Sequence, residues 1–138
     1  MKIVVVDGQG GGIGKSLVEK LRACLGDSAV ITALGTNALA TAAMLKAGAN
    51  DGATGENAVA INAASADIIT GSIGIIAANS MLGELTPKMA AAIASSEAQK
   101  VLIPLNRCNL HVSGTKNISL PEYIDGAVAI IVSLMGNM

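Results

Sequence analysis

The stretch KIVVVDGQGGGIGKS, residues 2–16, decides the fold class of this chain. Residues 3–6 are all isoleucine or valine, and a run that is apolar on both faces predicts a central parallel strand over Lys2–Asp7. A glycine-rich turn follows over Gly8–Gly14, and apolar residues then recur at helical spacing as far as Leu25. A strand, a glycine turn and a helix in this order predict the first unit of a parallel α/β sheet.

The rest of the chain repeats this alternation of strands and helices. Further strands are predicted over Ala29–Leu34, Asp67–Gly71, Lys100–Leu105 and, as a short one, Leu110–Ser113. Helices are predicted over Asn37–Ala47, Gly74–Leu82, Thr86–Ser95 and Glu122–Met135. Asp51–Ser65 is ambiguous, because a loop there is followed by either a helix or a strand. We therefore expect a single Rossmann-like α/β domain over residues 1–138, with three layers and a mostly parallel sheet of about four to five strands.

The composition excludes several classes of protein. With 51% hydrophobic and 14% charged residues, the chain is not intrinsically disordered. A net charge of −1, a single tyrosine and no tryptophan or phenylalanine argue against a nucleic-acid-binding surface. The mean hydropathy of +0.58 is high for a small monomer. We therefore expect a homodimer or a larger homo-oligomer that hides an apolar face.

The apolar runs and the cysteines bear on where the protein acts. The first apolar run stops at Asp7, too early for a signal peptide, and the run Ala127–Met135 is too short to span a membrane. We therefore expect a cytoplasmic protein without membrane contact. Cys24 and Cys108 are too few for a disulfide framework and lack the spacing of a zinc site. Cys24 falls on the apolar face of the first helix, and we expect it in the core.

The glycine turn is the strongest indication of function. Glycines between a strand and a helix let the chain turn tightly and let its backbone approach a phosphate. The start of the helix supplies free N–H groups and the positive end of its dipole. A turn that only packs the helix on the strand is the alternative. The residues predicted to bind a nucleotide phosphate are Gly8, Gln9, Gly10, Gly11, Gly12, Ile13, Gly14 and Lys15.

Two familiar phosphate-binding patterns fit this turn poorly. The pattern G-x-G-x-x-G fails, because its third glycine falls on Ile13. The P-loop pattern G-x-x-x-x-G-K-[ST] fits Gly14-Lys15-Ser16 but places Gln9 where its first glycine belongs. P-loop chemistry also needs an acidic residue at the end of a strand, whereas Asp67 begins the predicted third strand.

The wider pattern G-x-x-x-G-I-G fits Gly8, Gly12, Ile13 and Gly14. In this respect the loop resembles that of short-chain dehydrogenases/reductases, although Asp7 stands where that family usually has threonine. The resemblance implies NAD or NADP as the cofactor. It does not carry over the family's Tyr-x-x-x-Lys pair, because Tyr123 is followed four residues later by Ala127.

The loop after the predicted second strand has no charged residue with which to select a ribose. It contains neither an acidic residue for the ribose hydroxyls nor an arginine for a 2′-phosphate. Thr36 and Asn37 are candidates for hydrogen bonds to a cofactor. The alternative is that one of them caps the next helix.

Over most of its length the chain resembles a family of small bacterial proteins of unknown function. The resemblance implies a Rossmann-like fold without an established activity. The segments that carry it are DGQGGGIGK, ALGTNALAT, KAGANDGATGEN, GIIAANSMLGELTPKMA and IPLNRCN.

Residues beyond the other strands complete the predicted site, because ligands of open parallel sheets bind at the carboxyl ends of the strands. Arg107 could pair with a phosphate or lie at an interface, and Cys108 is either an inert thiol or a reactive one. His111 is expected on a strand face rather than as a general base, and no metal site is predicted. Weaker candidates, all expected in loops, are Glu56, Asn57 and Glu84. The candidate binding residues here are Gly71, Ser72, Asn79, Asn106 and Arg107.

These observations favour a nucleotide-binding sensor or accessory subunit, because the sequence has no recognisable acid–base pair. The first alternative is a small NAD(P)-dependent oxidoreductase with its nicotinamide near Ser72, Asn79 and Cys108. The second is a structural homodimer without a ligand.

Overall fold

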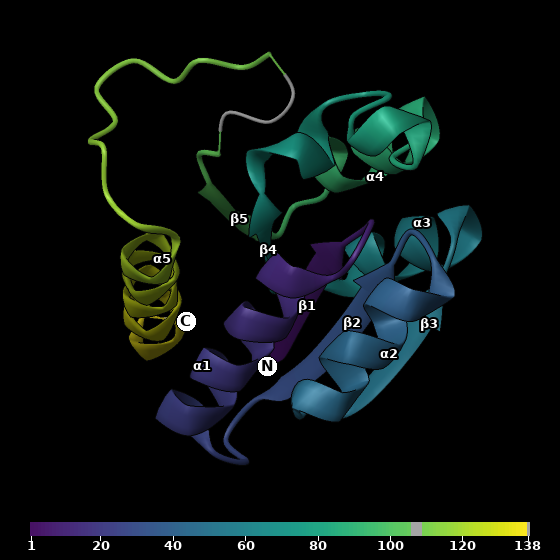
Figure 1. The fold of residues 1–138 in the computed structure, drawn as a ribbon. Coiled ribbons are helices and arrows are strands. Elements are labelled where there is room, and N and C mark those ends of the chain that lie inside the picture. The colour runs from purple at the N-terminus through teal and green to yellow at the C-terminus, as the bar shows by residue number, and fades with distance from the viewer. Residues whose placement is uncertain (106–108, 138) are drawn as a thin grey trace.

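The centre of the molecule is a five-stranded sheet in the order β3-β2-β1-β4-β5, and every neighbouring pair is parallel (Figure 1). The structure is a computed structural model that describes residues 1–105 and 109–137. The predicted three-layer, Rossmann-like α/β class is confirmed. The strands are β1 (Lys2–Asp7), β2 (Val30–Gly35), β3 (Asp51–Thr54), β4 (Ile68–Ser72) and β5 (Gln99–Ile103).

Helices pack on both faces of the sheet. One apolar core joins the sheet to α1 (Gly12–Leu25), α2 (Ala38–Ala47) and α5 (Leu120–Gly136). The other joins it to α3 (Glu56–Ser65) and α4 (Pro87–Ser95). Successive side chains of a strand point to opposite faces, so Ile3 and Val5 enter the first core and Val4 and Val6 the second. This double burial explains why β1 is apolar without alternation.

Side-chain caps set where several helices begin. Asn37 Oδ1 accepts a hydrogen bond from the N–H of Ala40 at 2.9 Å at the start of α2, which confirms the capping interpretation of Asn37. Ser119 and Glu122 form a reciprocal capping box at the start of α5.

The predicted helix over Gly74–Leu82 is wrong. The chain forms two short 3₁₀ turns, Ile73–Ile76 and Met81–Gly83. Ser80 Oγ donates a hydrogen bond to the carbonyl of Gly74 at 2.5 Å, and Asn79 adopts a left-handed φ of 66°. Serine and asparagine make local bonds of this kind in competition with helix formation, which accounts for the error.

Two other segments differ from the prediction or complete it. Leu110–Ser113 is not a strand, so His111 does not lie on a strand face. Residues 109–119 instead form an extended arm that leads to α5 (Figure 1). The ambiguous segment Asp51–Ser65 forms β3 and α3, and β3 is a short, largely exposed edge strand without an apolar pattern.

Among the described residues, no helix is both long enough and apolar enough to span a bilayer.

Candidate functional site

Asp7, the last residue of β1, organises the glycine loop. Its side chain is buried, with 6% exposed. Oδ1 accepts a hydrogen bond from the N–H of Gly8 at 2.8 Å, and Oδ2 accepts one from the N–H of Gly14 at 2.6 Å. Gly14 lies in the first turn of α1, so the carboxylate faces the positive end of the helix dipole. Asp7 therefore caps this helix in place of the N-cap residue Gly11, which has no side chain.

The loop is a tight turn packed against α2. The N–H of Gly11 donates to the carbonyl of Gly8 at 3.0 Å, and Gln9 and Gly11 have φ values of 49° and 75°. A Cβ added to Gly11 would lie 2.9 Å from the Cα of Ala40. Glycine is required at Gly11 both for its left-handed conformation and for this close approach.

The loop amides that remain are the donors that a ligand can use. Within 1–105 and 109–137, no acceptor is found for the N–H groups of Gly10, Gly12 and Ile13. Gly12 and Ile13 are the first two residues of α1, and the first N–H groups of a helix have no partner within it. Such groups are suited to binding an anion.

Glu84 ties the glycine loop to the turn after β2. Its Oε1 accepts hydrogen bonds from the N–H of Gln9 at 2.9 Å, from Thr36 Oγ1 at 2.7 Å and from Asn37 Nδ2 at 2.8 Å. The N–H of Gln9 first, and then the side chains of Thr36 and Asn37, hold the pKa of Glu84 below its ordinary value of 4.5. The carboxylate is therefore charged at neutral pH.

The backbone just before Glu84 is unusual. Asn79, Met81 and Leu82 have φ values of 66°, 58° and 56°, a region that residues other than glycine seldom adopt. Leu82 is 97% exposed, although it is a large apolar residue. Backbone strain of this kind is found preferentially at functional sites. The turn over residues 79–83 is therefore a candidate wall of a binding site.

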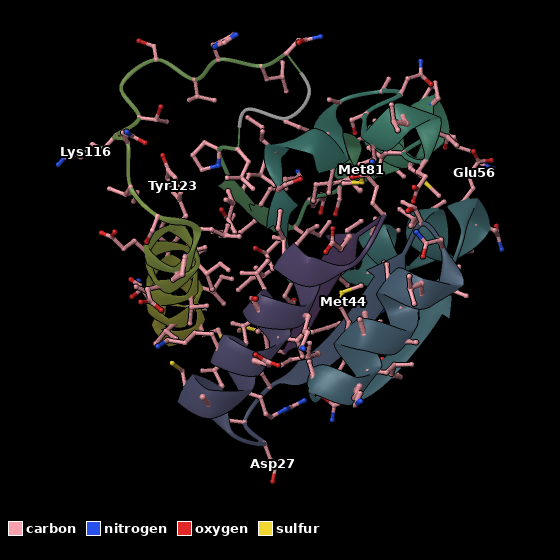
Figure 2. The ribbon with its side chains drawn as sticks, in the orientation of Figure 1. Asp27, Met44, Glu56, Met81, Lys116 and Tyr123 are labelled. Carbon is pink, nitrogen blue, oxygen red and sulfur yellow. The ribbon has the colours of Figure 1, made fainter. Side chains whose placement is uncertain are left out.

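A cavity of about 320 Å³ lies between this turn and the glycine loop. It reaches Asp7 at the end of β1 and Ser72 at the end of β4, and Figure 2 shows Met81 between the segment after β4 and the end of β1. The chain runs outward from β1 to β3 and then returns to β4 on the other side, so the cavity occupies the topological switch point of the sheet. Its lining consists of residues 7–13 together with Ser72, Gly74, Ser80, Met81, Leu82, Leu105 and Leu120.

The structure brings part of the predicted site together at this cavity. The predicted residues that line it are Gly8, Gln9, Gly10, Gly11, Gly12, Ile13 and Ser72.

The other predicted residues lie elsewhere. Gly14 donates to Asp7, and Thr36 and Asn37 bind Glu84. Gly71 lies inside β4, where an added Cβ would be 2.5 Å from the carbonyl oxygen of Val6. The exposed Lys15 and the turn residue Asn79 are not part of the lining. Outside the described residues lie Asn106, Arg107 and Cys108.

Sequence reasoning missed the carboxylate and the apolar wall of the cavity. The signal for Asp7 was available, because an acidic residue directly after a buried strand must find partners, and the adjoining loop amides supply them. Met81, Leu82, Leu105 and Leu120 come from three separate parts of the chain, and no local pattern joins them.

Other chemistry is limited in the described part of the chain. No group of three or more His, Cys, Asp or Glu side chains there could hold a metal. Glu56 and Asn57 begin α3 rather than lying in a loop, and Glu56 Oε2 accepts a hydrogen bond from Thr86 Oγ1 at 2.6 Å.

Cys24 is exposed, contrary to its predicted place in the core, because α1 turns Leu17 and Leu21 toward the sheet instead.

Solved structures that are similar to this chain include the following two. An FMN-dependent, Ubix-like decarboxylase from Escherichia coli O157:H7, described as dodecameric, has a TM-score of 0.48 and 12% identity, over 99% of this chain and 94% of that one. A universal stress protein in complex with cAMP has a TM-score of 0.40 and 18% identity, over 72% of this chain and 94% of that one. The resemblance of the glycine loop to that of short-chain dehydrogenases/reductases stays a prediction.

No functionally curated protein matches the chain. The family model described as a domain of unknown function (DUF3842) matches residues 2–136, and the chain therefore belongs to this family.

Proposed function

We propose that this chain binds a nucleotide in the cavity between the glycine loop and the segment after β4, and acts in the cytoplasm as a sensor or accessory subunit. One observation carries the proposal. The cavity at the switch point is lined by Gly10, Gly12 and Ile13, whose N–H groups have no acceptor within the described residues. Donors of this kind at a helix N-terminus bind phosphate through hydrogen bonds and the helix dipole.

The opposite wall suits the rest of a nucleotide. Met81, Leu82, Leu105 and Leu120 supply aliphatic surface against which a ring can pack. The hydroxyl of Ser72 adds a polar group on the same side. A site with backbone donors at one end and apolar side chains at the other fits an anionic ligand with a flat, less polar portion.

NAD or NADP is the ligand that the loop sequence favours, through the spacing of Gly8, Gly12 and Gly14. Asn106 and Arg107 directly follow Leu105, which lines the cavity, and they remain candidates for contacts with that ligand.

A binding role is favoured over an oxidoreductase. No His, Lys, Cys or Tyr occurs in the described lining, and its carboxylate, Asp7, is already hydrogen-bonded to the loop. Acid–base catalysis needs a group that is free to exchange a proton with the substrate.

The test is a thermal-shift series with NAD⁺, NADH, NADP⁺, NADPH, ATP, GTP and FAD. A ligand at one hundred times its Kd stabilises the native state by about 2.7 kcal/mol, which raises the midpoint measurably. Gly12→Asp should keep the fold, because an aspartate at the first position of α1 favours the helix dipole, but its charge should remove the shift. Gly136→Asp, at the far end of α5, is the matched control and should keep the shift. No shift with any nucleotide, or a shift that Gly12→Asp retains, would overturn the proposal.

A structural homo-oligomer is the second candidate. Ile130 and Val132 on α5 are 53% and 40% exposed, and a second copy of the chain would cover them. Sedimentation equilibrium should give a dimer or larger species that Ile130→Lys converts to monomer. A monomeric wild-type protein would contradict this candidate.

A further inference from the structure

At the switch point of the sheet, the side next to β4 contains the cavity and the side next to β2 does not. A dinucleotide in a Rossmann-like fold places its diphosphate on the glycine loop and one nucleoside on each side, and the adenosine ribose reaches the residues after the second strand. The cavity described above reaches the ends of β1 and β4, the residue Leu105 beyond β5, and the start of α5. No residue of β2 or of the turn that follows it contributes to the lining.

The side next to β2 is filled by the chain itself. Thr36 and Asn37, which stand where a ribose would be held, both donate to Glu84 Oε1, at 2.7 and 2.8 Å. Asn37 Nδ2 also donates to the carbonyl of Gln9 at 3.0 Å. The polar groups that could recognise an adenosine ribose are therefore used in contacts within the protein.

Packing closes the same side. A Cβ added to Gly8 would lie 2.7 Å from Met81 Sδ and 3.3 Å from Glu84 Oε1, and it would also collide with Thr36 Oγ1. On the β2 side of the loop, Gly8 thus packs directly against Thr36, Met81 and Glu84, whereas the cavity lies toward the end of β4. A ligand on the glycine loop would therefore extend over β4.

The volume agrees with this geometry. About 320 Å³ lies at the lower end of the range of small-molecule pockets, roughly 300–1,000 Å³. A mononucleotide is about half the size of a dinucleotide, so it fits a cavity of this volume better.

We infer that the site binds a mononucleotide. Its phosphate lies on the amides of Gly12 and Ile13, and its ring lies over β4 against Leu82, Leu105 and Leu120. Glu84 blocks the side next to β2, where the adenosine of a dinucleotide would bind. This inference rests on the proposed nucleotide binding and narrows its ligand class. It makes Glu84 a specificity-determining residue that does not touch the ligand.

Isothermal titration calorimetry with two dinucleotides and their own halves tests the inference. The probes are NAD⁺ with AMP and nicotinamide mononucleotide, and FAD with AMP and FMN. In the wild-type protein, at least one mononucleotide should bind more tightly than the dinucleotide that contains it. Tighter binding of NAD⁺ or FAD than of both its halves would overturn the inference and leave nucleotide binding intact. No binding of any of these probes would overturn the inference, and together with no thermal shift in the nucleotide series it would also overturn the proposed nucleotide binding.

Opening the closed side is the sharper test. Glu84→Ala releases the side chains of Thr36 and Asn37, and one or two new hydrogen bonds to a ribose should strengthen dinucleotide binding about tenfold relative to the mononucleotide. The matched control is Glu56→Ala, which also removes a carboxylate that accepts from a threonine hydroxyl, that of Thr86, but neither residue lines the cavity. Glu84→Gln keeps an acceptor oxygen for Thr36 and Asn37, so it should keep the wild-type ratio of dinucleotide to mononucleotide affinity even though it lowers stability. An unchanged ratio of dinucleotide to mononucleotide affinity in a folded Glu84→Ala protein would contradict the role of Glu84.

Discussion

Replacing Asp7 with asparagine should weaken the fold more than any other isosteric change of a carboxylate in the described chain. The wild-type carboxylate accepts from Gly8 at 2.8 Å and from Gly14 at 2.6 Å. Asparagine keeps one acceptor oxygen but turns an NH₂ group toward the other amide, which leaves a buried donor without a partner at a cost of about 1–3 kcal/mol. Losing the negative charge at the start of α1 costs about 0.3–2 kcal/mol more. The expected total is about 1.3–5 kcal/mol.

Urea denaturation followed by circular dichroism measures this loss. With a slope of about 2 kcal/mol per molar, the midpoint should fall by about 0.7–2.5 M. Asp67→Asn is the matched control, because Asp67 Oδ2 also accepts a backbone N–H, that of Lys2 at 2.7 Å, but on the exposed surface at the other end of β1. Its cost should stay near or below about 1 kcal/mol. Equal midpoints for the two variants would refute the reasoning that buried capping by Asp7 holds the loop.

Three further predictions concern single side chains. Gly71→Ala should destabilise the fold by about 2–3 kcal/mol in urea denaturation, because its Cβ would lie 2.5 Å from the carbonyl oxygen of Val6 in the central strand; a smaller loss than 1 kcal/mol would show that β4 can move. Gly126→Ala in α5 should stabilise by about 0.5–1 kcal/mol in the same assay, because the added Cβ meets no atom within 4 Å and alanine is the better helix former; a loss of stability would mean that the α5 surface is packed in solution. The folded-state pKa of Glu84 lies below 4.5, so its carboxylate stabilises the fold above that pH and the contribution disappears as the pH falls through the folded value. Glu84→Gln should therefore cost most at pH 7 and least at pH 3 in paired urea titrations, and a cost independent of pH would contradict the charge-based account.

The sheet was predictable because its strands are buried. The run over residues 3–6 is apolar on both faces since both faces carry a core, and the same holds for most of the strands that were expected. The strand β3 was not predicted from the sequence. It lies at an edge of the sheet and is largely exposed, so its sequence DGAT carries no apolar pattern. The helix expected over Gly74–Leu82 failed for a related reason. Apolar residues there line turns and a cavity wall instead of one helix face.

The candidate site was predictable only where one short segment builds it. The glycine loop lies between β1 and α1, and its position follows from that local order of elements. The partners of the loop are far away in the chain: Glu84 contacts Gln9, Thr36 and Asn37 across separations of 75, 48 and 47 residues. Such contacts depend on the sheet order, which a single sequence does not specify. Thr36 and Asn37 donate to Glu84 in the structure, and their predicted contacts with a ligand stay a prediction.

The two carboxylates at the glycine loop hold it in one conformation. Asp7 and Glu84 occupy the amides of Gly8, Gly14 and Gln9, and so hold the loop in shape before any ligand arrives. A preformed loop lowers the entropic cost of binding, which favours affinity. Within the described residues, the amides of Gly10, Gly12 and Ile13 have no acceptor, so an anionic group meets donors that are already in place.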